Sequence, residues 1–136
     1  MSSPEPDLSA TSRILLKKAE EDATAVREFA GNKEIADSII GFHAQQAVEK
    51  WLKAVTAASG TRHSTIHDID RLIEIVEATG IAVPLDRDRL AVLTQYAVPL
   101  RYDELLDSES LEREVLVVLV DEVAEWVAVQ IGPAGE

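Results

Sequence analysis

The chain of 136 residues has 25 acidic and 13 basic residues, a net charge of −12 and no cysteine. The missing cysteine excludes disulfides, thiolate metal sites and a cysteine nucleophile, and the acid excess argues against a broad DNA- or RNA-binding surface, so any RNA contact would be local. The length fits one domain, and the sequence has neither a signal-peptide pattern nor an apolar run near the roughly 18 residues of a membrane span, so we expect a cytoplasmic protein without DNA or membrane partners.

Two long helices are predicted in the first half of the chain. Residues 8–30 and 33–59 both have apolar side chains at three- and four-residue steps, which is typical of amphipathic helices. Asp7 or Ser9 is suited to cap the first helix, and Gly60 is suited to end the second. The predicted core positions are Ile14, Leu15, Ala19, Ala23, Val26 and Phe29 in the first helix, and Ile35, Ile39, Phe42, Leu52 and Val55 in the second.

Two shorter helices are predicted next. Residues 68–79 begin with Asp68, whose carboxylate suits the positive end of a helix dipole, and Gly80 follows the last apolar position. Residues 86–98 form the fourth predicted helix, which Pro99 ends. The predicted core positions are Ile69, Leu72, Ile73 and Val76 in the third helix, and Leu90, Leu93 and either Tyr96 or Ala97 in the fourth.

The last segment, residues 108–131, could form either a strand or a helix. Its middle, "VLVVLV", is rich in β-branched residues that suit a strand. The helical periodicity persists along the whole segment, however, which is much longer than an ordinary strand. We therefore predict a helix, and its nearly all-round apolarity indicates a central position or contact with a second protomer. Its apolar side comprises Leu111, Val115, Val118, Leu119, Val123, Trp126, Val127 and Ile131.

Five helices joined by short loops predict an all-α fold, an antiparallel bundle of about five helices. We expect a single helical domain over residues 8–131, with flexible ends at residues 1–7 and 132–136. From residue 102 onward the chain has ten acidic residues and one base, Arg113. This acidic end could serve as an interface or could simply aid solubility.

A polar stripe is predicted along the second helix, in the segment "GFHAQQAVEKWLKA". Either this stripe lines a polar cleft, or it forms a network that fixes helix packing. Glu49 and Lys53, four residues apart, are expected to pair on the exposed side. Small side chains in the stripe would let a neighbouring helix approach closely. The residues that share this face are His43, Gln46, Ala47, Lys50 and Ala54.

Sequence motifs give few candidates for chemistry. We expect no metal and no other cofactor, because compact metal-ligand spacings and glycine-rich phosphate loops are missing. In "RHSTIH", Arg62 and His67 could stabilise charge and move a proton, but we favour the alternative in which His67 anchors the third helix, with a hydrogen bond to the second, and Arg62 faces solvent. In "LRYDELLD", the consecutive Arg101, Tyr102 and Asp103 form either a site or a packed loop with its arginine tied to an acid.

Three segments, "FHAQQAVEKWLKAVTAASG", "HDIDRLIEI" and "LRYDE", occur in this order before a long last helix. Together they resemble the HEPN family of small helical proteins, over roughly residues 10–130. The resemblance implies a bundle of four to five helices, similar to the substrate-binding subunits of nucleotidyltransferases. It also implies a homodimer, and a minimal nucleotidyltransferase as partner in a toxin–antitoxin-like system.

Many members of that family are metal-independent endoribonucleases, in which an arginine and a histidine near the start of the last helix act together. The resemblance puts Arg101 in the place of this arginine, but the following residues, "YDELLDSESLE", contain no histidine. We therefore expect a noncatalytic module that binds a nucleotide or a partner. The alternatives are a ribonuclease toxin with a divergent site, with Arg101 and His67 as catalytic candidates, and a purely structural dimerisation protein. The expected ligand-binding residues are His43, Gln46, Lys50, His67, Arg101, Tyr102 and Asp103.

Overall fold

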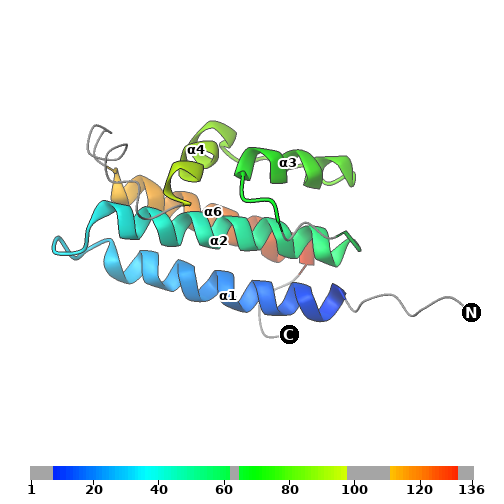
Figure 1. Ribbon diagram of the computed structural model, residues 1–136, viewed down its shortest axis with the longest axis horizontal. Helices are drawn as coiled ribbons and strands as arrows, with labels where there is room; N and C mark the ends of the chain where they lie inside the picture. The colour runs from blue at the N-terminus through cyan, green and yellow to red at the C-terminus, as the bar shows by residue number, and fades with distance from the viewer. Residues whose placement is uncertain (1–7, 62–64, 98–110, 132–136) are drawn as a thin grey trace, which may run out of the picture.

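A computed structural model describes residues 8–61, 65–97 and 111–131 (Figure 1). The ends that were predicted to be flexible lie outside these described residues, and so does the segment that contains Arg101. Within the described ranges the chain is helical and has no strand, which confirms the all-α prediction. The elements are α1 (Leu8–Phe29), α2 (Asp37–Ala58), α3 (Ile69–Ala78), α4 (Arg87–Val92), the 3₁₀ helix η1 (Leu93–Tyr96) and α6 (Arg113–Ile131).

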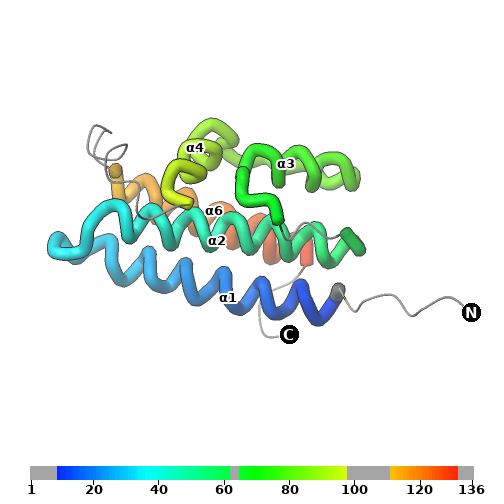
Figure 2. The backbone as a smooth tube through the Cα atoms, in the orientation of Figure 1, coloured from blue at the N-terminus to red at the C-terminus, as the bar shows by residue number. Residues whose placement is uncertain are grey.

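The central element is α2, which has α1 on one side, α6 on another and the α3–α4 arm on a third (Figure 2). The α1 and α2 helices run antiparallel, and α6 also runs antiparallel to α1. Because α2 is enclosed on several sides, its apolar surface extends around most of its circumference. Its apolar side chains with no exposed surface are Ile40, Ala44, Ala47, Val48, Leu52, Ala54 and Val55.

Small side chains allow α1 to lie close to α2. Ala19 and Ala23 of α1 and Ala47 and Ala54 of α2 are all fully buried. The Ser12 hydroxyl donates a hydrogen bond of 2.8 Å to the backbone carbonyl of Ala54. The predicted close approach at these two alanines of α2 is therefore confirmed, and the helix that approaches is α1.

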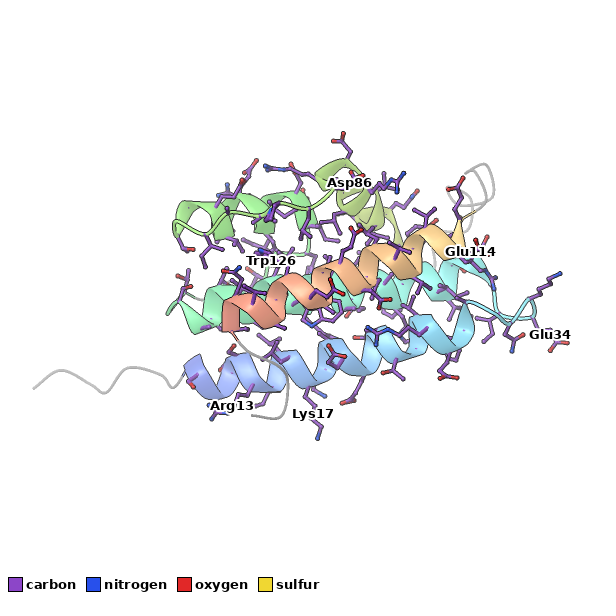
Figure 3. All side chains as sticks on the ribbon, turned by 180° about the vertical axis from the view of Figure 1, so that it is seen from behind. Arg13, Lys17, Glu34, Asp86, Glu114 and Trp126 are labelled. Carbon is purple, nitrogen blue, oxygen red and sulfur yellow. The ribbon has the colours of Figure 1, made fainter. Side chains whose placement is uncertain are left out.

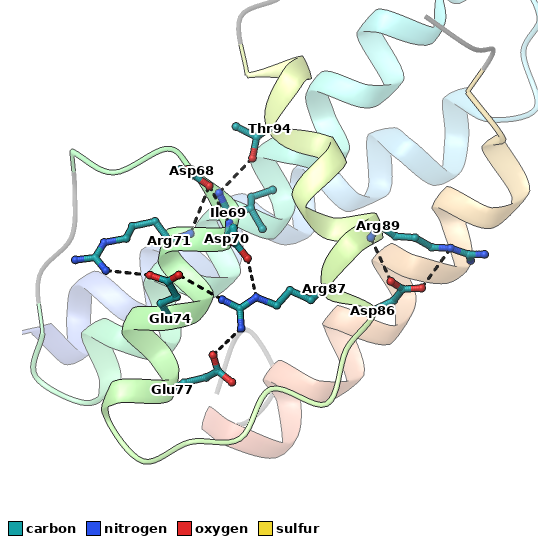
Figure 4. A network of polar contacts seen from close by, with 10 residues as sticks. All are labelled: Asp68, Ile69, Asp70, Arg71, Glu74, Glu77, Asp86, Arg87, Arg89 and Thr94. Carbon is teal, nitrogen blue, oxygen red and sulfur yellow. Dashed lines mark hydrogen bonds and ion pairs between the residues drawn. The ribbon is translucent and has the colours of Figure 1, made fainter.

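The α3–α4 arm is held together by polar contacts (Figure 4). Asp68 lies at the start of α3, where the sequence predicted it, and it also caps the helix by accepting hydrogen bonds from the backbone of Asp70 and Arg71. The Arg87 guanidinium of α4 contacts three acids of α3, namely Asp70, Glu74 and Glu77. Its hydrogen bond with Asp70, followed by the negative charges of all three acids, raises the pKa of Arg87.

The η1 helix packs directly on the backbone of α2. The Tyr96 ring lies over Gly41, where an added Cβ would come within 2.5 to 2.8 Å of three ring carbons. Burial raises the pKa of the Tyr96 hydroxyl, and the negative charge of Asp37 raises it further. The last residues before the undescribed segment 98–110 are thereby fixed at the N-terminal part of α2.

Arg113, at the start of α6, ties three parts of the chain together. Its Nε donates to Asp37 Oδ1 at 2.9 Å, and its terminal nitrogens donate to backbone carbonyls between α1 and α2. The acceptors, with distances, are the carbonyl oxygens of Phe29 at 3.5 Å, Ala30 at 3.3 Å, Asn32 at 2.9 Å and Ile35 at 2.6 Å. The guanidinium thus binds carbonyl groups at the end of α1 and in the following turn, where those of Phe29 and Asn32 also accept backbone N–H groups.

Further along α6, two side chains reach neighbouring elements. Asp121 forms an ion pair with Arg27 of α1 at 2.9 Å. The Trp126 indole donates to the carbonyl of Ala82, in the connection between α3 and α4, at 3.1 Å (Figure 3). The α6 helix therefore joins the α1–α2 pair to the α3–α4 arm.

Several details of the sequence prediction are wrong. The N-terminus of α2 is Asp37 rather than residue 33, and the fourth helix narrows to a 3₁₀ turn after Val92. The central helix is α2 and not the last helix, so the first alternative for the last helix is wrong, while its contact with a second protomer stays a prediction. Glu49 and Lys53 do pair, but both are buried because α2 is enclosed. Three predicted core residues are exposed because they lie on outward sides of their helices, namely Ile14, Ile39 and Val118.

Candidate functional site

The polar stripe of α2 lies beside α1 and is only partly covered. His43, Gln46 and Lys50 fall at three- and four-residue steps along the helix and have intermediate exposure. The exposed fractions of the His43 and Lys50 side chains are 28% and 24%. Ala47 and Ala54, which the sequence placed in the same stripe, are instead buried under α1. The half-exposed stripe is therefore narrower than predicted.

A single carboxylate of α1 holds two residues of the stripe. Asp22 Oδ1 lies 2.9 Å from His43 Nδ1, and Asp22 Oδ2 lies 2.5 Å from Lys50 Nζ. The Asp22 side chain is only 13% exposed, so water competes weakly for these contacts. The carboxylate fixes the His43 ring with Nδ1 toward α1 and leaves Nε2 free for another partner. The three side chains form what we call the Asp22 cluster.

Two aromatic rings lie next to His43 of the Asp22 cluster. The His43 ring lies 5.9 Å from the Phe29 ring, edge to face, and 5.6 Å from the Phe42 ring, centroid to centroid. Both phenylalanines are partly exposed. A ligand at His43 would therefore meet apolar ring surface as well as polar groups, a combination that suits a nucleobase.

The second polar group of α2 surrounds Glu49, a carboxylate that is 5% exposed. Glu49 Oε1 accepts from Gln45 Nε2 at 2.9 Å and lies 3.1 Å from His67 Nδ1. Lys53 Nζ donates to Glu49 Oε2 at 3.1 Å. Such a buried carboxylate requires several partners, and here it has them. We call this group the Glu49 cluster.

The Glu49 cluster links the stripe to the start of α3. Gln46 Nε2 donates to Gln45 Oε1 at 2.7 Å, and Gln45 in turn donates to Glu49. His67 contacts Glu49 from just before Asp68, the cap of α3, although the His67 side chain is 65% exposed. The structure therefore confirms that His67 anchors the third helix to the second.

The predicted site residues are brought together only in part. His43 and Lys50 meet at Asp22, whereas Gln46 and His67 belong to the Glu49 cluster. Arg101, Tyr102 and Asp103 lie outside the described residues. The described residues on either side of that segment are both near the start of α2: Tyr96 packs on Gly41, and the Leu111 backbone N–H donates to Asp37 Oδ2 at 3.3 Å.

Two central residues of the site, Asp22 and Gln45, did not emerge from the sequence analysis. A signal for Asp22 was available, because it lies three residues after Ala19 and four before Val26, both of which were predicted to be buried. An acid at such a border position either faces water or pairs across the helix interface. Its two partners, His43 and Lys50, were already predicted as part of the stripe of α2.

The described ranges contain no group of three or more histidine, cysteine, aspartate or glutamate side chains arranged to hold a metal ion. No described helix is long and apolar enough to cross a membrane. A sequence model of the HEPN domain matches residues 12–130. No curated protein and no solved structure matches the chain.

Proposed function

Because the chain belongs to the HEPN domain family, we propose that it is a noncatalytic module that binds a nucleotide or a protein partner through the half-exposed stripe of α2. The partner that the family suggests is a minimal nucleotidyltransferase in a toxin–antitoxin-like system. The observation that supports this proposal best is the Asp22 cluster. It holds a histidine and a lysine in fixed positions at the surface, next to two aromatic rings.

Lys50 is the proposed phosphate contact among the described residues. Its ammonium group has three donors, and Asp22 accepts from one of them, so a ligand oxygen could take another. His43 can offer Nε2 to the same ligand. The negative charge of Asp22 would also repel an anionic ligand, so the affinity for a phosphate group would depend on further cations. We propose that Arg101 supplies such a cation and that Tyr102, Asp103 and His67 contact the ligand.

Binding is favoured over catalysis because of what His67 and Arg113 contact. Cleavage of RNA by its own 2′-hydroxyl needs a proton acceptor and a cation that stabilises charge at the phosphate. His67 contacts the buried Glu49, while Arg113 donates to Asp37 through Nε and to backbone carbonyls through both terminal nitrogens. These contacts suit packing and positioning more than proton transfer.

Thermal unfolding with and without nucleotides tests the binding proposal. A ligand at 100 times its Kd stabilises the folded state by about 2.7 kcal/mol, which gives a clear rise in Tm. We expect this rise to disappear in Lys50→Met, which removes the ammonium group and keeps most of the apolar stem. Lys33→Met is the matched control, because Lys33 is exposed in the turn before α2. Equal shifts in both variants would exclude Lys50 as a contact.

The proposed binding of a protein partner is tested by co-expression with a minimal nucleotidyltransferase and purification through a tag on this chain. A stable complex that His43→Ala or Lys50→Met weakens would support the stripe as the interface. If neither nucleotides nor such a partner bind the purified protein, the binding proposal is wrong.

A ribonuclease is the second candidate, and one observation favours it. Asp22 orients His43 through Nδ1, an arrangement that suits proton transfer at the other ring nitrogen. RNA cleavage and growth arrest should be followed for Arg101→Ala, His67→Ala and His43→Ala. Cleavage by the purified protein that is lost with Arg101 would show that the noncatalytic proposal is wrong.

A further inference from the structure

Lys18 of α1 is exposed and has no hydrogen-bond or ion-pair partner in the part of the chain that the structure describes. Most other bases in that part are paired with acids, which outnumber bases by 25 to 13 in the chain. The paired bases are Arg27, Lys50, Lys53, Arg71, Arg87, Arg89 and Arg113. The ammonium group of Lys18 is therefore available to a ligand.

The position of Lys18 in the sequence of α1 puts it on the helix edge that borders the stripe of α2. Lys18 comes four residues before Asp22, and Phe29 comes seven residues after it, so all three lie along one edge. Asp22 contacts both His43 and Lys50. The Phe29 ring lies 5.9 Å from the His43 ring. Lys18 therefore borders the same stripe, one helical turn from Asp22.

Along this edge, Lys18 lies level with Lys50. The α1 and α2 helices are antiparallel, so the residues of α1 before Asp22 run beside the later part of the stripe. Farther in this direction, the Ser12 hydroxyl donates to the carbonyl of Ala54. Lys18 lies between Ser12 and Asp22, on the turn that faces Lys50. Packed helices lie about 8 to 10 Å apart, so the two long side chains can both reach one anion between them.

The charge of Lys18 changes the electrostatics at this end of the stripe. Within the Asp22 cluster, the positive charge of Lys50 is balanced by the Asp22 carboxylate at 2.5 Å. A phosphate beside Lys50 is therefore repelled by Asp22 almost as strongly as Lys50 attracts it. With Lys18 included, the three side chains have one net positive charge. Lys18 is thus a further cation of the kind that phosphate binding at the stripe needs.

The spacing within the Asp22 cluster limits the size of the ligand. His43 Nδ1 and Lys50 Nζ are no more than about 8 Å apart, because each contacts one oxygen of the same carboxylate. A nucleoside monophosphate has one sugar between its base and its phosphate, which suits this short separation. A triphosphate would extend beyond Lys18, where the next residues along the edge, Leu15 and Thr11, have no charge.

We propose that Lys18 and Lys50 together bind the single phosphate of a nucleoside monophosphate, with its base against the ring of His43. This inference rests on the function proposed for the stripe and deepens it, because it names the class of ligand and adds a contact from α1. The Phe29 ring offers apolar surface for the base next to His43. Lys50 is held in place by Asp22, whereas the exposed Lys18 side chain can adjust to the ligand.

Isothermal titration calorimetry with the four common ribonucleoside 5′-monophosphates tests the proposal. The salt concentration is about 0.1 M, which largely screens charges more than about 10 Å apart. For the monophosphate that binds most tightly, we expect Lys18→Met to raise the Kd about fivefold, which corresponds to about 1 kcal/mol, the upper end for an exposed charge pair. Lys18→Arg keeps the charge and should bind like the wild type.

Lys17→Met is the matched control, because it removes the same charge from the neighbouring residue. Lys17 lies about 100° farther round α1, on its outer side (Figure 3). Its substitution should change the Kd by less than about twofold. The triphosphate of the same nucleoside should bind no more tightly than the monophosphate, and circular dichroism checks that each variant is folded.

The possible failures of this inference and of the proposed function are distinct. Equal Kd values for Lys17→Met and Lys18→Met would overturn the role of Lys18, and tighter binding of the triphosphate would overturn a monophosphate as the ligand. In both cases the nucleotide site on α2 would stand. If none of the nucleotides binds the wild type, this inference is overturned together with the nucleotide part of the proposed function.

Discussion

The contact between Gly41 and Tyr96 gives the most direct test of the fold. Replacing Gly41 with alanine places a Cβ 2.5, 2.6 and 2.8 Å from three carbons of the Tyr96 ring. Carbon atoms normally pack at about 3.5 to 4.0 Å, so the ring would have to move by roughly 1 Å. Tyr96 is only 5% exposed and lies in a short helix, so little room is left for this movement.

Two opposing effects decide the outcome of Gly41→Ala. Alanine favours a helix over glycine by about 1 kcal/mol, whereas inserting a methyl group into a packed interior is unfavourable by about 1 to 3 kcal/mol. For a contact this short we take the upper part of that range and expect a net loss of about 1 to 2 kcal/mol in the free energy of unfolding. Urea unfolding followed by circular dichroism measures the loss.

Two further variants isolate the cause. Gly31→Ala is the matched control, because an added Cβ there has no atom within 4 Å and the backbone is not left-handed. Its effect should stay within about 0.5 kcal/mol. In a Tyr96→Ala background, Gly41→Ala should become stabilising by up to about 1 kcal/mol, because only the helix preference remains. If Gly41→Ala stabilises the protein with Tyr96 present, η1 does not pack on α2 as described.

Three other substitutions have defined outcomes. Arg113→Lys should lower the free energy of unfolding by about 1 to 3 kcal/mol, because an ammonium group cannot reach Asp37 and the carbonyls together. Unchanged urea unfolding would contradict the role of Arg113 in joining these parts of the chain. Glu49→Gln should destabilise by about 2 to 3 kcal/mol because it removes a buried negative charge that Gln45, Lys53 and His67 contact. A denaturation midpoint equal to that of the wild type would refute this. The pKa of Tyr96 is raised in the folded protein, so the unfolded chain ionises first as pH rises. Burial of the neutral Tyr96 hydroxyl therefore contributes fully to the free energy of unfolding below about pH 10, and this contribution is lost at higher pH. Tyr96→Phe should therefore lose less stability than the wild type between pH 9 and about 11 in urea titrations, and parallel losses would exclude Tyr96 as a source.

Local signals in the sequence were sufficient where one helix packs with one face. In α3 the apolar steps at Ile69, Leu72, Ile73 and Val76 match the buried side chains, and Asp68 is the cap. These features depend only on residues within the helix and its first turn, so periodicity and capping rules apply directly. Gly60 and Gly80, both in the left-handed conformation, follow α2 and α3 as predicted.

Features that depend on distant parts of the chain could not be predicted. The turn before Asp37 is non-helical in a segment that was predicted as helix, and its carbonyls bind Arg113 from the far end of the chain. Similarly, Glu49 and Lys53 look like an exposed helical pair in the sequence. Their burial follows from the number of elements around α2, which no local pattern records.

The residues of the candidate site could likewise be predicted only in part. The sequence identified His43, Gln46 and Lys50 because they share one helical face. It did not identify Asp22, because the contact of His43 and Lys50 with α1 depends on how the two helices are paired. The sequence also did not show that Gln46 is linked to His67 through two other side chains.

The two tryptophans of the chain lie in environments that fluorescence can distinguish. Trp51 is 1% exposed within α2, whereas Trp126 is bonded to Ala82 in the α3–α4 connection. A Trp51→Phe protein would emit only from the indole that reports on this connection, and a Trp126→Phe protein only from the bundle interior. Comparing their emission during titration with denaturant would reveal whether the α3–α4 arm separates from the rest before the bundle itself opens.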